Sequence, residues 1–158
     1  MSLGSSGARF KDLYLSGGVY LGGTGAANKL DDYEEGTFTL SSSAGTLTYL
    51  YGSGSTYTKI GNRVIIDLGQ LQITGVPNNS TVFVLTGLPF STQGQSGMAT
   101  AFVNTGFGTS GGTQWFSMYI ESNQIYISKR NSSYLLTNAD ITGETYVFSA
   151  GGSAYRTA

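Results

Sequence analysis

The 158-residue chain contains no histidine and no cysteine, which removes the side chains of several common catalytic sites. Without imidazole there is no Ser-His-Asp triad, and without a thiol there is neither a cysteine nucleophile nor a cysteine-ligated zinc site. The acid and base chemistry that remains open is a pair of carboxylates, as in glycoside cleavage.

The carboxylates beyond residue 36 are few and scattered along the chain. Asp67 falls on the polar phase of an alternating strand pattern, where a solvated position is expected. Asp140 and Glu144 flank a turn at residues 141–143, where aspartate favours local hydrogen bonds, and Glu121 stands apart from both. No spacing places two of them in one cleft, so the sequence predicts a protein that is not an enzyme.

A second acidic group, Asp31, Asp32, Glu34 and Glu35, offers the hard oxygen ligands that Ca²⁺ prefers. Its spacing does not match the EF-hand pattern. We therefore expect these carboxylates to keep a junction hydrated and to meet Lys29 or Arg9 of a neighbouring chain. No metal and no cofactor is predicted.

Two loops carry residues suited to binding a polar ligand, because a β scaffold presents loops at its surface. Residues 104–113 form a long glycine-rich segment, and residues 129–134 combine cations, an amide and an aromatic ring, which can hydrogen-bond sugar hydroxyls and stack on a sugar. An ordinary solvated turn remains the alternative for the Lys129 and Arg130 pair, as core packing does for Trp115. The predicted receptor contacts are Phe107, Trp115, Lys129, Arg130, Asn131 and Tyr134.

The elements that would position these loops are strands, because apolar residues recur with a period of two. Residues 63–74 show the pattern with a phase slip at Gly69, which indicates a β-bulge or turn. Ser122 and Asn123 separate two strand patterns and predict a tight hairpin. Residues 135–141 alone suggest a short helical turn. Further strands are expected at residues 10–15, 19–21, 46–51, 56–60, 81–86, 98–103, 114–121, 124–129 and 145–150, with turns at 52–54, 76–79 and 94–97.

The amino-acid composition narrows both the fold class and the range of expected partners. Charged residues make up 11%, below the roughly 25% of average soluble domains, while the chain has 24 glycines and 13% aromatic residues. A net charge of −1 gives no basic surface for nucleic acid, so nucleic acid is not an expected partner. Many short strands and few helix formers predict an all-β fold, a β-sandwich, barrel or jelly roll. Because cysteine is absent, oligomerisation is the expected source of extra stability.

The segment RFKDLYLSGGVYLGGTGAANKLDDYEEGTFTL at residues 9–40 resembles the neck of bacteriophage tail fibres. It joins two short strand patterns through Ser16, Gly17 and Gly18 and continues through the acidic turn LDDYEEGT into a strand at Thr37. YTKIGNRV at 57–64 and TGLPF at 86–90 are similar to the β-rich tips that follow such necks. The resemblance implies an intertwined trimeric β neck at residues 1–35 and a jelly-roll or β-sandwich receptor-binding tip at residues 36–158.

The same resemblance implies a function in the virion. The expected protein is a noncatalytic homotrimer that joins other tail fibre segments and attaches to a polysaccharide or outer-membrane protein of the bacterial surface. Three linked sites would raise avidity even where each site is weak. Two alternatives stay open at this point, a depolymerase of capsular or lipopolysaccharide glycan and a purely structural trimerisation or connector module.

Overall fold

The computed structural model describes residues 3–51, 54–94, 96–98, 104–105, 113–114, 117–128, 135, 137–141, 146–150 and 153–157. The described chain is all-β, as the sequence predicts, and its helices are two short 3₁₀ turns. The chain forms two compact units, which divide after Asp32. The jelly-roll topology and the trimeric neck remain predictions.

The N-terminal unit holds one small ladder. Strand β1 (Val19–Tyr20) pairs antiparallel with β2 (Lys29–Leu30), and the 3₁₀ turn η1 (Ala26–Asn28) leads into β2. Gly18 permits this close approach, because a Cβ at that position would lie 2.6 Å from the Leu30 carbonyl oxygen. Residues 10–15 form no strand within the single chain, where no described strand pairs with them, and their expected pairing between chains stays a prediction.

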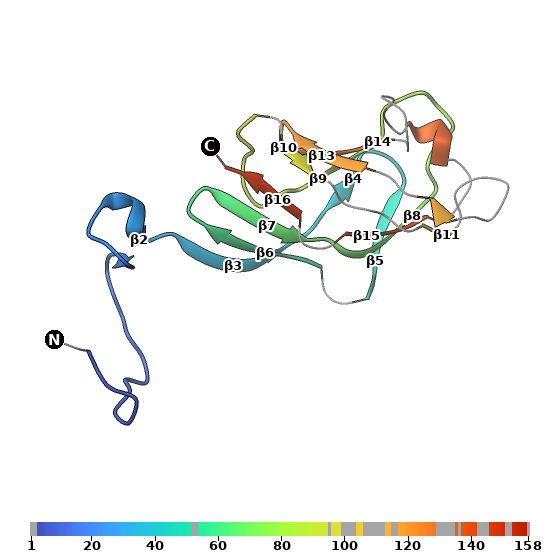
Figure 1. The fold of residues 1–158 in the computed structure, drawn as a ribbon. Coiled ribbons are helices and arrows are strands. Elements are labelled where there is room, and N and C mark those ends of the chain that lie inside the picture. Colours follow the sequence, from blue (N-terminus) through green and yellow to red (C-terminus); the bar gives the residue numbers. More distant parts are fainter. Residues whose placement is uncertain are drawn as a thin grey trace. The chain divides into compact units, whose positions relative to one another are not determined.

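The second unit contains the remaining strands in several antiparallel ladders (Figure 1). A five-stranded sheet has the order β10-β13-β14-β9-β4, and a four-stranded sheet has the order β16-β7-β6-β3. A three-stranded sheet, β15-β8-β5, extends the four-stranded one, because β7 and β8 are separated by Leu68 alone. The bounds are β3 (Tyr33–Phe38), β4 (Ser41–Ser42), β5 (Thr46–Tyr51), β6 (Ser55–Ile60), β7 (Arg63–Asp67), β8 (Gly69–Thr74), β9 (Val84–Thr86), β10 (Ser96–Met98), β13 (Ser117–Glu121), β14 (Gln124–Ser128), β15 (Tyr146–Ala150) and β16 (Ser153–Arg156).

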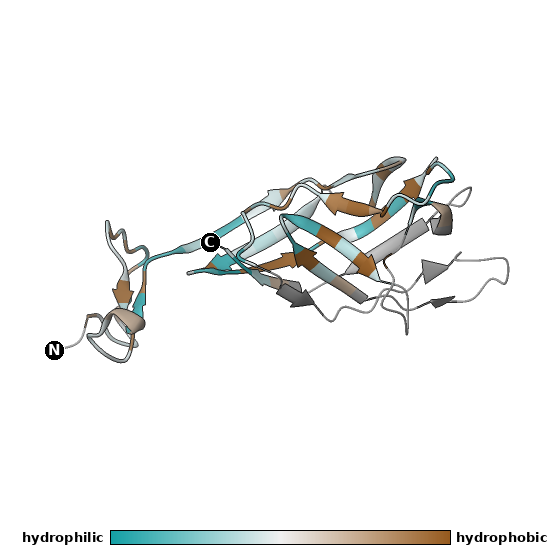
Figure 2. Ribbon diagram, turned by 90° about the horizontal axis from the view of Figure 1, so that it is seen from above, coloured by the Kyte–Doolittle hydropathy of each residue, from teal (hydrophilic) through white to brown (hydrophobic). Residues whose placement is uncertain are grey.

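Alternating side chains of the two layers meet in a single core. Figure 2 shows apolar residues, in brown, on several strands of this unit. The inward residues of β7 and β8 are fully buried, and so are those of β13, β14 and the segment around β9. Removing this apolar surface from water is the main stabilising term for a sandwich of this size. The core comprises Phe38, Leu40, Val64, Ile66, Leu68, Leu71, Ile73, Val76, Phe83, Leu85, Met118, Ile120, Ile125, Ile127 and Tyr155.

The phase slip predicted at Gly69 is confirmed as a break between β7 and β8. Gly69 has φ +66°, a left-handed conformation that glycine adopts without a steric penalty. Its N–H donates to the Asp67 carboxylate at 3.0 Å, and the buried Ser55 hydroxyl donates to the Leu68 carbonyl at 3.1 Å. These two bonds satisfy polar groups that the irregularity removes from the ladder.

Three other boundaries differ from expectation. Strand β3 begins at Tyr33 instead of Thr37, because the acidic turn pairs with β6 through Glu34 opposite Lys59 and Glu35 opposite Thr58. The turn expected at residues 94–97 is wrong at Ser96 and Gly97, which pair with β13. The expected helical turn at 135–141 appears as η2 (Asn138–Ile141).

Candidate functional site

All six predicted receptor contacts lie outside the described residues, so that site stays a prediction. The structure does define where both loops begin and end. Residues 129–134 connect Ser128 to Leu135, which form an antiparallel bridge with each other. The 104–113 segment is closed by a ladder between β11 (Asn104–Thr105) and β12 (Thr113–Gln114). Each segment is therefore flanked by residues whose backbones pair with each other.

The described residues offer a different candidate on the outer face of the five-stranded sheet. In the β13–β14 hairpin, Ser122 and Asn123 have φ of 51° and 63°, which suits a two-residue turn with right-handed strand twist. This turn fixes the register in which Tyr119 stands opposite Tyr126. Alternation sends Met118, Ile120, Ile125 and Ile127 into the core, so the two tyrosines face outward.

The two tyrosine rings lie parallel, with centroids 5.0 Å apart and an interplanar angle of 7°. Tyr119 is flanked on its other side by β10, where its cross-strand partner is Gly97. Glycine has no side chain that could cover the ring. Tyr119 and Tyr126 are both half-buried, so the stacked pair still reaches solvent.

A row of polar residues runs beside this pair across four strands. Glu121 stands opposite Gln124, Gln124 opposite Thr86, and Thr86 opposite Ser41. The Tyr126 hydroxyl donates to the Gln124 side-chain oxygen at 2.7 Å, which leaves the Gln124 amide hydrogens directed elsewhere. Burial, followed by the nearby Glu121 carboxylate, raises the pKa of Tyr119. The Tyr119 phenol is therefore neutral and able to donate at physiological pH. We call Tyr119, Tyr126, Glu121, Gln124 and Gly97 the tyrosine platform.

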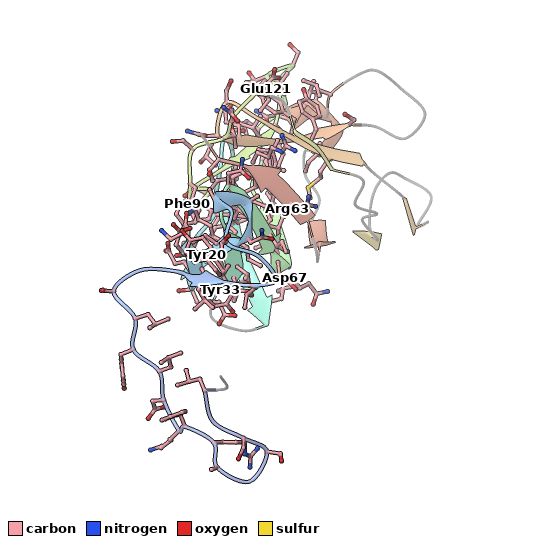
Figure 3. The ribbon with its side chains drawn as sticks, turned by 60° about the vertical axis from the view of Figure 1, so that its left-hand side comes forward. Tyr20, Tyr33, Arg63, Asp67, Phe90 and Glu121 are labelled. Carbon is pink, nitrogen blue, oxygen red and sulfur yellow. The ribbon has the colours of Figure 1, made fainter. Side chains whose placement is uncertain are left out.

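The outer face of the four-stranded sheet has another character. Tyr33, Ile60, Arg63 and Arg156 form one cross-strand row, and Ile65 lies in the next row. Tyr33, Ile60 and Ile65 are exposed. The two arginines stand directly opposite one another, an arrangement that costs energy between like charges. Neither forms an ion pair within the part of the chain that the structure describes; Figure 3 shows Arg63 and Tyr33.

The carboxylates of the acidic turn have partners inside the chain. Lys29 and Asp31 form an ion pair at 2.8 Å, which lowers the pKa of Asp31. The Tyr57 hydroxyl donates to Glu34, and the Tyr33 hydroxyl donates to Glu35. Lys29 was expected to meet a carboxylate of a neighbouring chain, whereas this contact lies within one chain.

Two of the carboxylates weighed for acid and base chemistry, Asp67 and Glu121, lie among the described residues. Asp67 projects from β7 and Glu121 from β13, which belong to opposite layers, so these two carboxylates do not share a cleft (Figure 3). Within the same residues there is no group of three or more acidic side chains that could hold a metal ion. None of the described helices has the length and apolar character needed to cross a membrane.

Comparison of the chain with protein families, curated proteins and solved structures finds no match. The tyrosine platform was not among the sequence predictions. A usable signal was present, because a two-residue turn at 122–123 places residue 119 opposite residue 126.

Proposed function

We propose that this protein is the noncatalytic receptor-binding tip of a bacteriophage tail fibre, assembled as a homotrimer in the virion and attached through its N-terminal unit to other fibre segments. Its partner on the host is a surface glycan or an outer-membrane protein. The proposal joins the resemblance of residues 9–40 to tail fibre necks with the exposure of the N-terminal unit.

The carrying observation is that no described residue of the N-terminal unit is buried. Tyr14 is 91% exposed and Leu13 is 62% exposed, and Phe10, Leu15 and Leu21 are exposed as well. A two-stranded ladder with apolar side chains in water is marginal on its own. Three copies wound together would cover these side chains, and this supports assembly over an isolated monomer.

The outer face of the four-stranded sheet gives a second argument for assembly. The Arg63 and Arg156 pair forms no ion pair within the described residues and stands beside exposed apolar side chains. A carboxylate from a neighbouring copy would relieve the repulsion and bury the adjacent apolar surface. A trimer supplies such a neighbour to every chain.

The test is competition for host cells. Purified protein, incubated with candidate host bacteria before infection, should block adsorption of the corresponding phage and leave the bacterial glycan at its original chain length. Shortened glycan would favour a depolymerase instead. Unblocked adsorption by a folded trimer, across strains that the phage infects, would favour a connector without receptor contact.

A separate variant tests the receptor contacts predicted in the loop at residues 129–134. Replacing Lys129, Arg130 and Tyr134 by alanine should abolish adsorption while the trimer mass and the melting temperature stay unchanged. Each lost charge-assisted hydrogen bond costs about 1.5–3 kcal/mol, and the loss is multiplied over three linked sites. Full adsorption by the folded variant would move the receptor site off this loop.

A further inference from the structure

We propose that the tyrosine platform on the outer face of the five-stranded sheet is a binding site for a neutral saccharide. The inference deepens the proposed function and rests on it for the source of the ligand, a glycan of the host surface. It also places a site on the strands of a sheet, apart from the loops that the sequence favours.

The aromatic part of the site is suited to the apolar face of a sugar ring. Each tyrosine turns one ring face to the other, at a centroid separation of 5.0 Å. The second face of Tyr119 is turned toward β10, where Gly97 stands opposite it without a side chain. A pyranose presents C–H groups on one face, and covering them with an aromatic ring removes apolar surface from water on both partners.

The polar part of the site is suited to hydroxyl groups. Within the described residues, neither the Tyr119 hydroxyl nor the Glu121 carboxylate has a hydrogen-bond partner, although both stand on the same face of β13. Gln124 accepts from Tyr126, so its amide hydrogens remain as donors beside the Glu121 acceptor. A carboxylate next to an amide donor matches the paired donors and acceptors of adjacent sugar hydroxyls.

Charge restricts the class of sugar. Apart from the two tyrosines, Glu121 is the ionisable residue of the platform. Its carboxylate repels uronic acids and phosphorylated or sulfated sugars. Among the described cations, Lys59, Arg63 and Arg156 belong to strands of the four-stranded sheet, of which β16, with Arg156, also lies beside β10. The platform therefore favours neutral hexoses and N-acetylhexosamines over anionic sugars.

A purely structural role for the ring pair is the competing explanation, since stacked cross-strand aromatics also stabilise sheets. The two roles differ at Gly97. Replacing Gly97 by threonine keeps both tyrosines and adds a side chain beside the Tyr119 ring, so it should block a ligand without removing the stack. Glu121→Gln tests the polar half, because it preserves shape and removes the charge.

The experiment uses the full chain and two defined probe sets. Neutral probes are galactose, glucose and N-acetylglucosamine, and anionic probes are glucuronic acid and galactose 6-sulfate; binding is measured by saturation-transfer NMR and by titration. We expect at least one neutral probe to bind with a Kd of about 1 mM or tighter, and the anionic probes to bind at least about tenfold more weakly. Tyr119→Ala and Gly97→Thr should each weaken the neutral probe by at least about tenfold, and Glu121→Gln by about threefold or more. Tyr33→Ala, an exposed strand tyrosine of the other layer, should leave the Kd unchanged.

Absence of binding by every neutral probe would overturn the proposal, as would unchanged affinity in a folded Gly97→Thr variant. Should Tyr119→Ala fail to fold, Gly97→Thr and Glu121→Gln carry the test.

Failure of this inference is separable from failure of the proposed function. If the protein blocks phage adsorption and the Gly97→Thr variant blocks it equally well, the tip function holds and the platform is wrong. If saccharide binding follows the variants but adsorption is never blocked, the platform holds and the tip function is wrong.

Discussion

The Tyr155 hydroxyl is bound to both backbone groups of Phe90, accepting from its N–H at 3.2 Å and donating to its C=O at 3.3 Å. Tyr155 lies on β16 and is 2% exposed. The contact ties the C-terminal strand to the segment that follows β9. The Phe90 ring also stacks edge-on against Tyr57, with centroids 5.1 Å apart, and the Lys59 ammonium lies 5.6 Å from its centre.

Tyr155→Phe should destabilise the sandwich by about 1–3 kcal/mol, because it removes two hydrogen bonds and leaves the Phe90 backbone groups with poorer partners. Thermal or urea unfolding measures the change. Tyr119→Phe is the matched control, since the Tyr119 hydroxyl has no partner within the described residues, and its unfolding free energy should change by less than about 0.5 kcal/mol. Equal losses in the two variants would show that the Phe90 contact contributes nothing specific.

Stability should fall at alkaline pH through the same tyrosine. Burial raises the pKa of Tyr155 to about 12, above the value near 10 of an unfolded tyrosine. Below pH 10 the phenol is protonated in both states and its contribution is intact; between pH 10 and 12 only the unfolded state ionises, so stability declines with rising pH. Unfolding midpoints measured from pH 8 to 12 check this, and Tyr155→Phe should show a shallower decline.

Across pH 5–8 the melting temperature should be constant. The chain has no histidine, and the resolved shifts lower the pKa of Asp31 and raise those of tyrosines, which moves each group away from this window. Calorimetry at several pH values provides the measurement. A cooperative transition near pH 6 would reveal a carboxylate with a strongly raised pKa.

Local sequence signals predict the fold where the chain makes short-range pairs. The strand at residues 46–51, the hairpin at 122–123 and the irregularity at Gly69 follow from alternation and turn chemistry, and all three are confirmed. Strands β4 and β16 were missed. Ser41 and Ser42 carry no apolar alternation and become a strand through pairing with β9, which lies more than forty residues away. Pairing of this kind depends on the tertiary fold.

The candidate site shows the same division. The hairpin register brings Tyr119 opposite Tyr126, and this follows from the turn alone. The position of Gly97 beside Tyr119 does not follow from the turn. It requires β10 to pair with β13 in a register that sets Gly97 opposite Tyr119. The sequence suggested a turn at Gly97, so it did not predict this strand pairing.

The β13–β14 turn should respond to substitution in opposite directions. Asn123 adopts a left-handed φ, its side-chain oxygen accepts from the Thr92 N–H at 2.6 Å, and its own N–H donates to the Thr92 hydroxyl at 3.1 Å. Asn123→Ala should therefore cost about 1–2 kcal/mol. Ser122→Asn should stabilise by about 0.5 kcal/mol, since asparagine tolerates this conformation better than serine. Denaturant unfolding with unchanged m-values tests both, and stabilisation by Asn123→Ala would contradict the turn assignment.

The last prediction concerns the N-terminal unit and the assembled state. Light scattering of the full chain should give three times the 16.6 kDa chain mass. Removal of residues 1–32 should raise the concentration at which the trimer half-dissociates by at least about tenfold, or about 1.4 kcal/mol, because each apolar side chain covered by a partner contributes about 1.5–3 kcal/mol. The sandwich should keep its own cooperative unfolding, since every residue of its core lies between Phe38 and Tyr155.

Point variants of the same segment test the same contact. The double variant Leu13→Ser with Leu15→Ser should also weaken the trimer, whereas Lys11→Ala, an exposed polar change in the same segment, should not. A clean monomer at micromolar concentration would refute the trimer, and an unchanged trimer after truncation would show that the sandwich alone drives assembly, through a surface such as the outer face that carries Arg63 and Arg156.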